Sequence, residues 1–300
     1  MKKLNKTVLV LFLILFLSFF LRFFRLAKVP ISLNWDEASF AYNAYSVLTT
    51  GKDEYGAAHP LLFKSVGDYK NPLLVYILIP SIKIFGLNEF AIRFPTAFFA
   101  SLTPLILFYL VKEIFSNIKI AFLSSLLLTI SPWHLQFSRA GLEPPISLFL
   151  ITLGILGFVI AVKKEKFFLY LSAFSFALSF YSYYADRFFV PILVILLFFL
   201  FRDELNKIKS TSIKAVFLGF LLILPLIGPF FSLGSQRKVL ITTIFGYKPP
   251  FEYTSRMLKE DKSEILFSLF HNEVLERGWT ILDHYANHFS PSFLFLGGPT

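Results

Sequence analysis

Residues 8–21 read VLVLFLILFLSFFL, an unbroken apolar run of fourteen residues. Residues 1–6 before it carry three lysines, and two arginines follow within residues 22–26. A basic start ahead of an apolar run also occurs in signal peptides, but no small-residue cleavage site follows here. We therefore expect an uncleaved membrane-spanning helix over about residues 8–24, with the N-terminus in the cytoplasm.

The composition of the whole chain agrees with a membrane protein. Hydrophobic residues make up 56% and charged residues 16% of the 300 positions, and the mean hydropathy is +0.67. A soluble domain of this length needs more surface charge. The net charge of +10 is better explained by basic cytoplasmic loops than by a nucleic-acid partner. Cysteine is absent, which excludes disulfides and thiol chemistry.

Seven segments are long or apolar enough to cross a bilayer, where a typical span takes about 20 residues. The sequence thus predicts an all-α polytopic membrane protein. The predicted spans are residues 8–24, 94–111, 120–137, 146–162, 167–184, 188–201 and 213–231. The sixth is short and must tilt or include flanking residues. An eighth apolar stretch, residues 72–85, is shorter than a span and carries a lysine, so we expect an interfacial or re-entrant helix there.

The basic clusters set the predicted orientation. They fall on one side of the membrane only if residues 72–85 do not cross it. The clusters are Lys2/Lys3/Lys6, Lys112/Lys119, Lys163/Lys164/Lys166 and Arg202/Lys207/Lys209/Lys214. We therefore expect the cytoplasmic (inner) membrane, a cytoplasmic N-terminus, a membrane module over residues 1–231 with a large outer loop at 25–93, and an extracytoplasmic segment over 232–300.

Two adjacent carboxylates, Asp36 and Glu37, lie just beyond the outer end of the first span. One interpretation is structural, because acids in the first turn of a helix through residues 38–42 interact favourably with its dipole. The other is catalytic, because paired acids near a membrane surface are candidates for proton transfer. The spacing alone does not choose between them.

Two cations follow in the same outer loop. Lys70 directly precedes the apolar stretch 72–85 and would either extend towards the interface or contact a phosphate as a point charge. Arg93 opens the second span, with Pro95 expected in its first turn. The simplest reading of Arg93 is an interfacial anchor paired with Glu89, four residues earlier.

A further charged pair follows the third span. Arg139 and Glu143 are four residues apart and would share one face of a helix. They would either pair with each other, or Arg139 would hold an anion while Glu143 faces the same cavity as Asp36. Ionisable residues this close to apolar spans favour a functional role. The turn at residues 181–187 reads instead as tyrosine anchors followed by an Asp-Arg pair.

The order of these motifs resembles the membrane glycosyltransferases of the C-type fold. Among these it is most similar to the bacterial relatives of protein O-mannosyltransferases and to the lipid A aminoarabinose transferases. The resemblance extends over about residues 5–300. It rests on the acidic pair, the Lys-x-Pro motif at 70–72, the stretch GLNEFAIRFP at 86–95, and SPWHLQFSR at 131–139 with an acid downstream.

This resemblance implies a seven-helix module and an enzyme that moves a sugar from a polyprenyl phosphate, with inversion, to an acceptor. The acceptor would be a protein hydroxyl, a lipid or a cell-envelope glycan. By position in the motifs, Asp36 matches the catalytic acid and Glu37 its acidic neighbour, Lys70 matches a phosphate-contacting lysine, and Arg139 and Glu143 match the residues after the third span. Arg93 completes the predicted substrate-binding residues.

The chain also departs from that pattern. Where relatives have Glu-Lys-Pro-Pro, residues 69–72 read Tyr-Lys-Asn-Pro, so an acid that could bind a metal is missing, although Asp68 is near. No cofactor is certain, and the resemblance leaves room for a divalent metal. Relatives continue through more helices, so the chain reads as a truncated N-terminal part. Two alternatives stay open: a transporter or flippase of lipid-linked sugars, and a non-catalytic membrane protein.

Overall fold

The computed structural model describes residues 6–65, 69–230 and 273–290. The chain divides into two compact units, residues 1–229 and 230–300. In the second unit, helix α16 (Glu273–Asn287) is described; that this segment is extracytoplasmic stays a prediction. The site lies entirely in the first unit.

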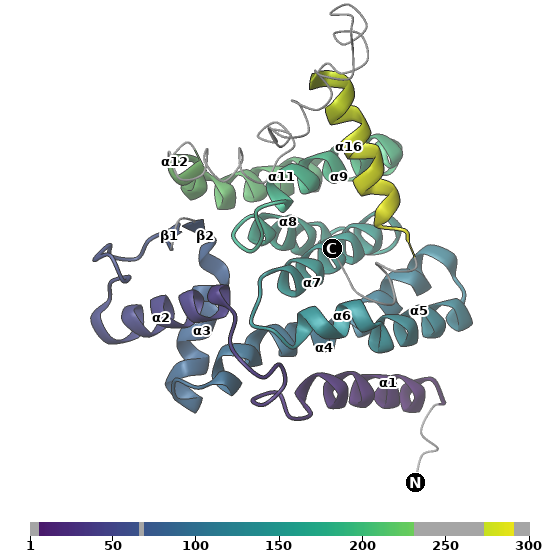
Figure 1. The fold of residues 1–300 in the computed structure, drawn as a ribbon. Coiled ribbons are helices and arrows are strands. Elements are labelled where there is room, and N and C mark those ends of the chain that lie inside the picture. The colour runs from purple at the N-terminus through teal and green to yellow at the C-terminus, as the bar shows by residue number, and fades with distance from the viewer. Residues whose placement is uncertain (1–5, 66–68, 231–272, 291–300) are drawn as a thin grey trace, which may run out of the picture. The chain divides into compact units, whose positions relative to one another are not determined.

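Helices make up most of the first unit (Figure 1). A short antiparallel hairpin, β1 (Phe63–Lys64) with β2 (Tyr69–Lys70), pairs Phe63 with Lys70. The helices are α1 (Lys6–Phe23), α2 (Trp35–Thr50), α3 (Pro72–Phe85), α4 (Glu89–Phe115), α5 (Ile118–Ile130), α6 (Pro132–Ser138), α7 (Pro144–Lys163), α8 (Phe168–Ser179), α9 (Asp186–Leu200), α10 (Arg202–Lys207), α11 (Lys209–Ile223), the 3-10 turn η1 (Leu224–Leu226) and α12 (Ile227–Phe230).

A helix covers most or all of each predicted span, but not every helix is long enough to cross a bilayer. Among the described residues, α1, α4, α7 and the continuous stretch from α11 to α12 meet the requirements of length and apolarity. A fifth span results if α5 and α6, which are bent by 55°, count as one. Helix α8 has only 12 residues and α9 has 15. The chain is thus a multi-pass membrane protein, whereas the count of seven spans stays a prediction.

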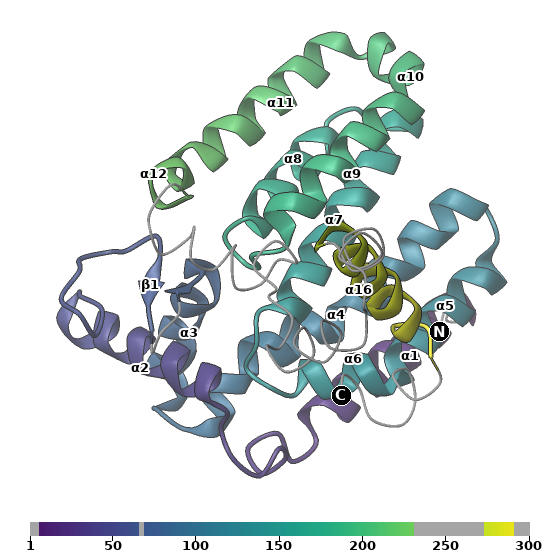
Figure 2. The ribbon, with the colours of Figure 1, turned by 45° about the horizontal axis from the view of Figure 1, so that its top comes forward.

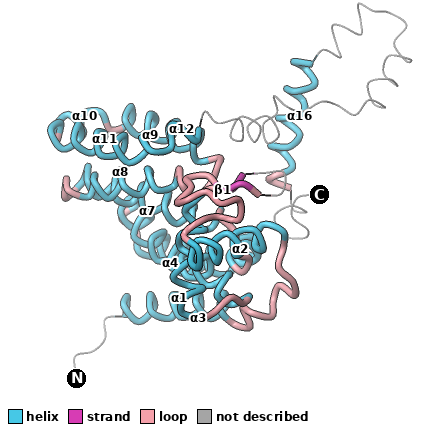
Figure 3. The backbone as a smooth tube through the Cα atoms, turned by 90° about the vertical axis from the view of Figure 1, so that its left-hand side faces the viewer, coloured by secondary structure: helices cyan, strands magenta, loops and turns pink. Residues whose placement is uncertain are grey.

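The central helices of the first unit are α4 and α7. In their apolar windows 56% and 67% of residues are buried, against 17% in α1 and 17% in the α11–α12 stretch. Helix α4 packs against α1, α3, α5 and α7, and α8 packs between α7 and α11. Figures 2 and 3 show this succession from α1, through α4, α7 and α8, to α11. The peripheral helices expose apolar side chains, as helices in contact with lipid do.

The two ends of the central helices differ in chemistry. At one end, the Glu113 carboxylate accepts a hydrogen bond from Lys164 at 2.6 Å, and its backbone carbonyl accepts one from Lys163. The C-terminal ends of α4 and α7, which carry two of the predicted basic clusters, therefore lie side by side. The opposite end of these helices holds α2, the hairpin and α3 (Figure 1).

Local sequence explains the elements at that second end. Asn34 caps the start of α2, and Gly51 ends it in the left-handed conformation, with φ of 72°, which glycine adopts without strain. Pro72 occupies the first turn of α3, where its missing N–H is not needed. Helix α4 begins earlier than predicted, at Glu89 behind the Asn88 cap. Pro95 therefore lies in the second turn of α4 and not in the first.

Candidate functional site

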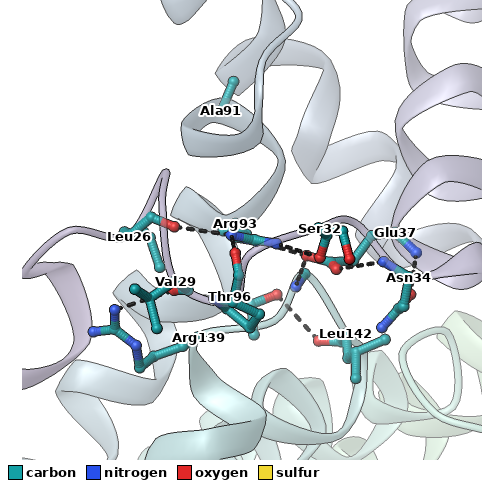
Figure 4. Close-up of polar contacts among 12 residues, drawn as sticks. Leu26, Val29, Ser32, Asn34, Glu37, Ala91, Arg93, Thr96, Arg139 and Leu142 are labelled. Atoms are coloured by element: carbon teal, nitrogen blue, oxygen red, sulfur yellow. Dashed lines mark hydrogen bonds and ion pairs between the residues drawn. The ribbon is translucent and has the colours of Figure 1, made fainter.

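Glu37 is buried at the third position of α2, and both of its carboxylate oxygens are engaged. Oε2 accepts from the backbone N–H of Asn34 at 2.9 Å, while the Asn34 side chain accepts from the N–H of Glu37 at 2.7 Å. This capping box satisfies two N–H groups reciprocally. Oε1 accepts from Arg93 Nε and from the Gly141 N–H, each at 2.9 Å (Figure 4). Glu37 thereby joins α2, α4 and the segment between α6 and α7.

Arg93 is fully buried and forms its ion pair with Glu37. The predicted pairing of Arg93 with Glu89 is therefore wrong. The remaining hydrogen bonds of the guanidinium go to backbone carbonyls of the segment between α1 and α2, namely Leu26 at 3.1 Å, Pro30 at 2.8 Å and Ser32 at 3.0 Å. Hydrogen bonds from a charged guanidinium are strong and geometrically specific, so they hold the loop that supplies the acceptors in place. Arg93 therefore fixes the path of the chain that leads to Asp36.

Gly141 allows the close approach on which this buried cluster depends. A Cβ atom at this position would lie 2.9 Å from the backbone carbonyl oxygen of Ile92 and 3.5 Å from Glu37 Cγ. Any larger residue would therefore displace the segment between α6 and α7 from α4, and the Gly141 N–H would no longer reach Glu37.

Asp36 differs from its neighbour in exposure. Its side chain is 50% exposed, and Oδ1 accepts a hydrogen bond from Lys70 Nζ at 2.6 Å. The Asp36 carboxylate thus combines a charged partner with access to solvent. Of the two adjacent acids, Asp36 is the one that an incoming molecule can reach.

Lys70 is held at the end of β2, with its side chain 8% exposed. Its backbone is fixed by the pairing with Phe63, and its ammonium lies 5.9 Å from the ring centroid of Phe40. The structural interpretation of the sequence is a lysine that extends towards the membrane interface, whereas this side chain is nearly buried. The ammonium is directed towards the Asp36 carboxylate.

Arg139 directly follows α6 as its C-cap residue, and its side chain is directed to the end of α1. The guanidinium donates to four backbone carbonyls, those of Leu21 at 2.6 Å, Arg22 at 3.2 Å, Phe24 at 2.8 Å and Val29 at 3.1 Å. Burial, and then the nearby charge of Arg93, lower the pKa of Arg139. In Figure 4 its guanidinium points away from Glu37. Arg139 satisfies carbonyls that the end of a helix leaves unpaired.

Glu143 is 8% exposed and lies on the other side of the same segment, directly before α7. Its Oε1 accepts from the backbone N–H of Asn71 at 3.3 Å. Arg139 and Glu143 therefore do not share a helical face as predicted, because α6 ends at Ser138 and α7 begins at Pro144. Glu143 instead touches the residue that follows Lys70.

The structure thus divides the six predicted site residues. Asp36 and Lys70 form one pair, with Glu143 attached through the neighbour of Lys70, while Glu37 and Arg93 form a buried pair beside it. Arg139 belongs to the end of α1. The described part of the chain holds no group of three His, Asp or Glu side chains placed to bind a metal, and Asp68 lies outside the described residues.

The sequence did not single out Asn71 or Arg187 as site residues. Asn71 directly follows Lys70, and Arg187 contacts Asn71. Asn71 accepts from Arg187 Nη2 at 2.8 Å and donates to the Ser182 carbonyl at 3.3 Å. The predicted pair of Asp186 with Arg187 is wrong. The Asp186 carboxylate instead accepts from Ser147 Oγ at 2.7 and 2.9 Å. The signals were present: a polar residue inside the Lys-x-Pro motif, and a cation directly before an apolar run.

Solved structures with a similar fold come from a yeast and an archaeon. The Saccharomyces cerevisiae protein O-mannosyltransferase Pmt1–Pmt2 complex, solved with its sugar donor, matches with a TM-score of 0.57 and 16% identity over 80% of this chain and 34% of its own. The apo oligosaccharyltransferase of Archaeoglobus fulgidus matches with 0.61 and 15% identity over 97% and 35%.

The Archaeoglobus fulgidus oligosaccharyltransferase AglB, in complex with an inhibitory peptide and a dolichol-phosphate, matches with a TM-score of 0.59 and 14% identity over 96% of this chain and 38% of its own. The present chain spans about a third of the length of these proteins. None of the proteins with curated descriptions matches it by sequence.

A family model is more specific than these likenesses of fold. The model described as dolichyl-phosphate-mannose-protein mannosyltransferase matches residues 69–232, more than half of the chain. The match begins at the end of the hairpin, includes Lys70, Arg93, Arg139 and Glu143, and runs to the end of the first unit. The chain therefore belongs to this mannosyltransferase family, within the membrane glycosyltransferases of the C-type fold.

Proposed function

We propose that this protein transfers a hexose or pentose from a polyprenyl-phosphate donor to a hydroxyl group of an acceptor, with inversion. The observation that carries the proposal is the pair of a half-exposed Asp36 carboxylate and a nearly buried Lys70 ammonium, 2.6 Å apart. A carboxylate that reaches solvent beside a fixed cation offers a proton acceptor and a phosphate contact in one place. Family membership, the yeast structure solved with its sugar donor and the archaeal structure solved with a dolichol-phosphate support the same chemistry.

The residues would act in one displacement. The acceptor oxygen attacks the anomeric carbon, the bond from that carbon to the phosphate oxygen breaks, and the acceptor proton passes to Asp36. Polyprenyl phosphate leaves with the bonding electrons, and Lys70 offsets the negative charge that grows on it. A positioned base contributes roughly 10²–10⁴-fold, and preorganised charge at the leaving group is often the larger contribution.

The remaining site residues would act through position. Glu37 and Arg93 hold the start of α2 so that Asp36 faces Lys70. Glu143 holds the backbone directly after Lys70. Arg139 fixes the end of α1, and this organisation of the outer segment is its proposed contribution to substrate binding.

We further propose that this reaction takes place on the outer face of the cytoplasmic membrane, with the N-terminus inside. The support is the separation of chemistry between the two ends of α4 and α7. Lys163 and Lys164 lie at one end with Glu113, and the Asp36–Lys70 pair belongs to the elements at the other. A basic end is expected to face the cytoplasm.

The test is sugar transfer from a radiolabelled polyprenyl-phosphate sugar in membranes that contain the chain. Asp36→Asn removes the proton acceptor but keeps the size of the side chain, so turnover should fall about 10²–10⁴-fold. Lys70→Gln should chiefly weaken use of the donor. The matched control is Asp203→Asn, because Asp203 is exposed and its ion pair among the described residues is with Arg202, at 3.6 Å.

Unchanged turnover of Asp36→Asn, measured against the same amount of folded protein, would remove Asp36 from catalysis. Movement of the labelled donor across the bilayer without any glycosylated product would favour the transporter alternative.

A further inference from the structure

We propose that Arg187 is a second phosphate-binding cation beside Lys70 and that it contacts the phosphate of the lipid-linked donor. This inference rests on the proposed function and adds a residue to its donor site. The sequence predicts a structural pair of Arg187 with Asp186, but no such ion pair is present among the described residues.

Arg187 is a buried charge with one nitrogen that forms no hydrogen bond among the described residues. It is 6% exposed, and none of the ion pairs in the described residues includes it. Nη2 donates to Asn71 Oδ1 at 2.8 Å and Nε to the Phe180 carbonyl at 3.3 Å. Nη1 has no hydrogen-bond partner within the described part of the chain. Asn71 is neutral and the Tyr184 ring lies 4.6 Å away; the nearby Glu143 carboxylate favours the charged guanidinium but does not occupy Nη1.

Such an arrangement is costly unless something else occupies it. A buried charge loses its hydration, and an unsatisfied donor on that charge adds a further penalty. The carboxylate of Asp186, adjacent in the chain, accepts from Ser147 and forms no ion pair with Arg187 among the described residues. A guanidinium with one unused nitrogen is suited to an anion with several acceptor oxygens, and phosphate is such an anion.

The position of Arg187 links this anion site to Lys70. Asn71, which receives the Arg187 hydrogen bond, directly follows Lys70 in the chain. Two hydrogen bonds to backbone carbonyls hold the two segments together: the Leu73 backbone N–H donates to the Tyr181 carbonyl at 3.0 Å, and the Asn71 side-chain Nδ2 donates to the Ser182 carbonyl at 3.3 Å. The turn that carries Arg187 is therefore fixed against the motif that carries Lys70.

An apolar cavity adjoins the same two segments. It has a volume of about 270 Å³, and its lining includes Pro72, Leu73, Leu178, Tyr181 and Leu222. Leu73 and Tyr181 are the residues whose backbones hold the two segments together. Arg187 does not line this cavity itself, but it contacts Asn71, the residue directly before the lining residue Pro72. A cation with an unused donor on the segments that border an apolar cavity matches an amphiphile with a phosphate head and a hydrocarbon chain. This combination favours a lipid phosphate over free phosphate.

The experiment compares the affinity of the purified chain in nanodiscs for a polyprenyl monophosphate and for the matching polyprenol. The ratio of the two affinities isolates the contribution of the phosphate. Arg187→Gln should lower this ratio about tenfold or more, because a hydrogen bond between charged groups is lost, and should leave the polyprenol affinity unchanged. Arg202→Gln, at an exposed arginine that pairs with Asp203, is the matched control and should leave the ratio unchanged.

A second variant keeps the arginine and tests the same idea if Arg187→Gln does not fold. Asn71→Asp would place a carboxylate at the atom that now accepts from Arg187, so the guanidinium would be neutralised from within. The phosphate ratio should again fall. A folded Asn71→Asp protein with the wild-type ratio would overturn the proposal.

The outcomes separate this inference from the proposed function. If Lys70→Gln lowers the ratio and Arg187→Gln does not, Arg187 is not a phosphate contact, while the donor site stands. If neither variant changes the ratio, both proposals fail. Inorganic phosphate is the third probe: if it protects the chain against thermal unfolding as strongly as the polyprenyl monophosphate does, the ligand is free phosphate and the lipid assignment is overturned.

Discussion

Two ion pairs begin at consecutive residues of α2, and they differ in almost every physical respect. The Glu37–Arg93 pair is 2% and 0% exposed, and its members form further hydrogen bonds with two other segments, one between α1 and α2 and one between α6 and α7. The Asp36–Lys70 pair is 50% and 8% exposed. The first pair has the properties of a structural cross-link, whereas the second leaves a carboxylate that a ligand can reach. One residue of separation on a helix turns the two carboxylates into different environments, because successive side chains point about 100° apart.

The comparison predicts its largest effect on stability for the buried pair. Glu37→Gln would leave the Arg93 charge buried without a carboxylate, and breaking one partner of a buried pair costs about 3–5 kcal/mol. We expect the free energy of unfolding in detergent to fall by that amount. A loss below about 1 kcal/mol would mean that water enters the cluster, and the contrast between the two pairs would disappear.

Arg139 gives an intermediate test. Its four hydrogen bonds go to carbonyls at and beyond the end of α1, so Arg139→Gln should remove most of them. We expect a loss of about 1–3 kcal/mol, because hydrogen bonds from a charged donor to a half-exposed segment are partly replaced by water. Hydrogen exchange should show the loss of protection in residues 21–29 but not in α7. Unchanged protection there, together with weaker donor binding, would instead make Arg139 a direct phosphate contact.

The contrast also explains what the sequence could predict. The sequence predicts a helix in each of the spans because a long apolar run is a local feature of the sequence. The order of the motifs identifies the family. The partners were not visible. Arg93 pairs with Glu37, which lies 56 residues away, in place of the nearby Glu89. Arg22, within the predicted first span and without a predicted partner, is buried, and its Nη2 lies 2.6 Å from His134 Nδ1. Spacing along a helix predicts local pairs, whereas buried charges select partners brought together by packing.

The same reasoning accounts for the divided site. Asp36 and Lys70 were predicted as separate motifs, and their contact depends on the hairpin, which brings the end of β2 towards the start of α2. The periodicity of apolar residues does not reveal a two-residue strand. The sequence predicts a pair of Arg187 with Asp186 because they are neighbours in the chain. In the structure Asp186 accepts from Ser147, and Arg187 donates to Asn71.

The smallest expected effect concerns the stability of the exposed pair. Asp36→Asn should lower the free energy of unfolding by less than about 1 kcal/mol, because the carboxylate is half in water and such pairs contribute little. The measurement is the same detergent unfolding as for Glu37→Gln, with Asp203→Asn as the reference for an exposed acid. If Asp36→Asn unfolds the protein as readily as Glu37→Gln, any loss of turnover in the Asp36 variant reports on folding, and the assignment of catalysis to Asp36 loses its support. If stability is retained while turnover falls by two orders of magnitude or more, the two adjacent acids have separate roles, one in holding the outer segment and one in accepting the proton.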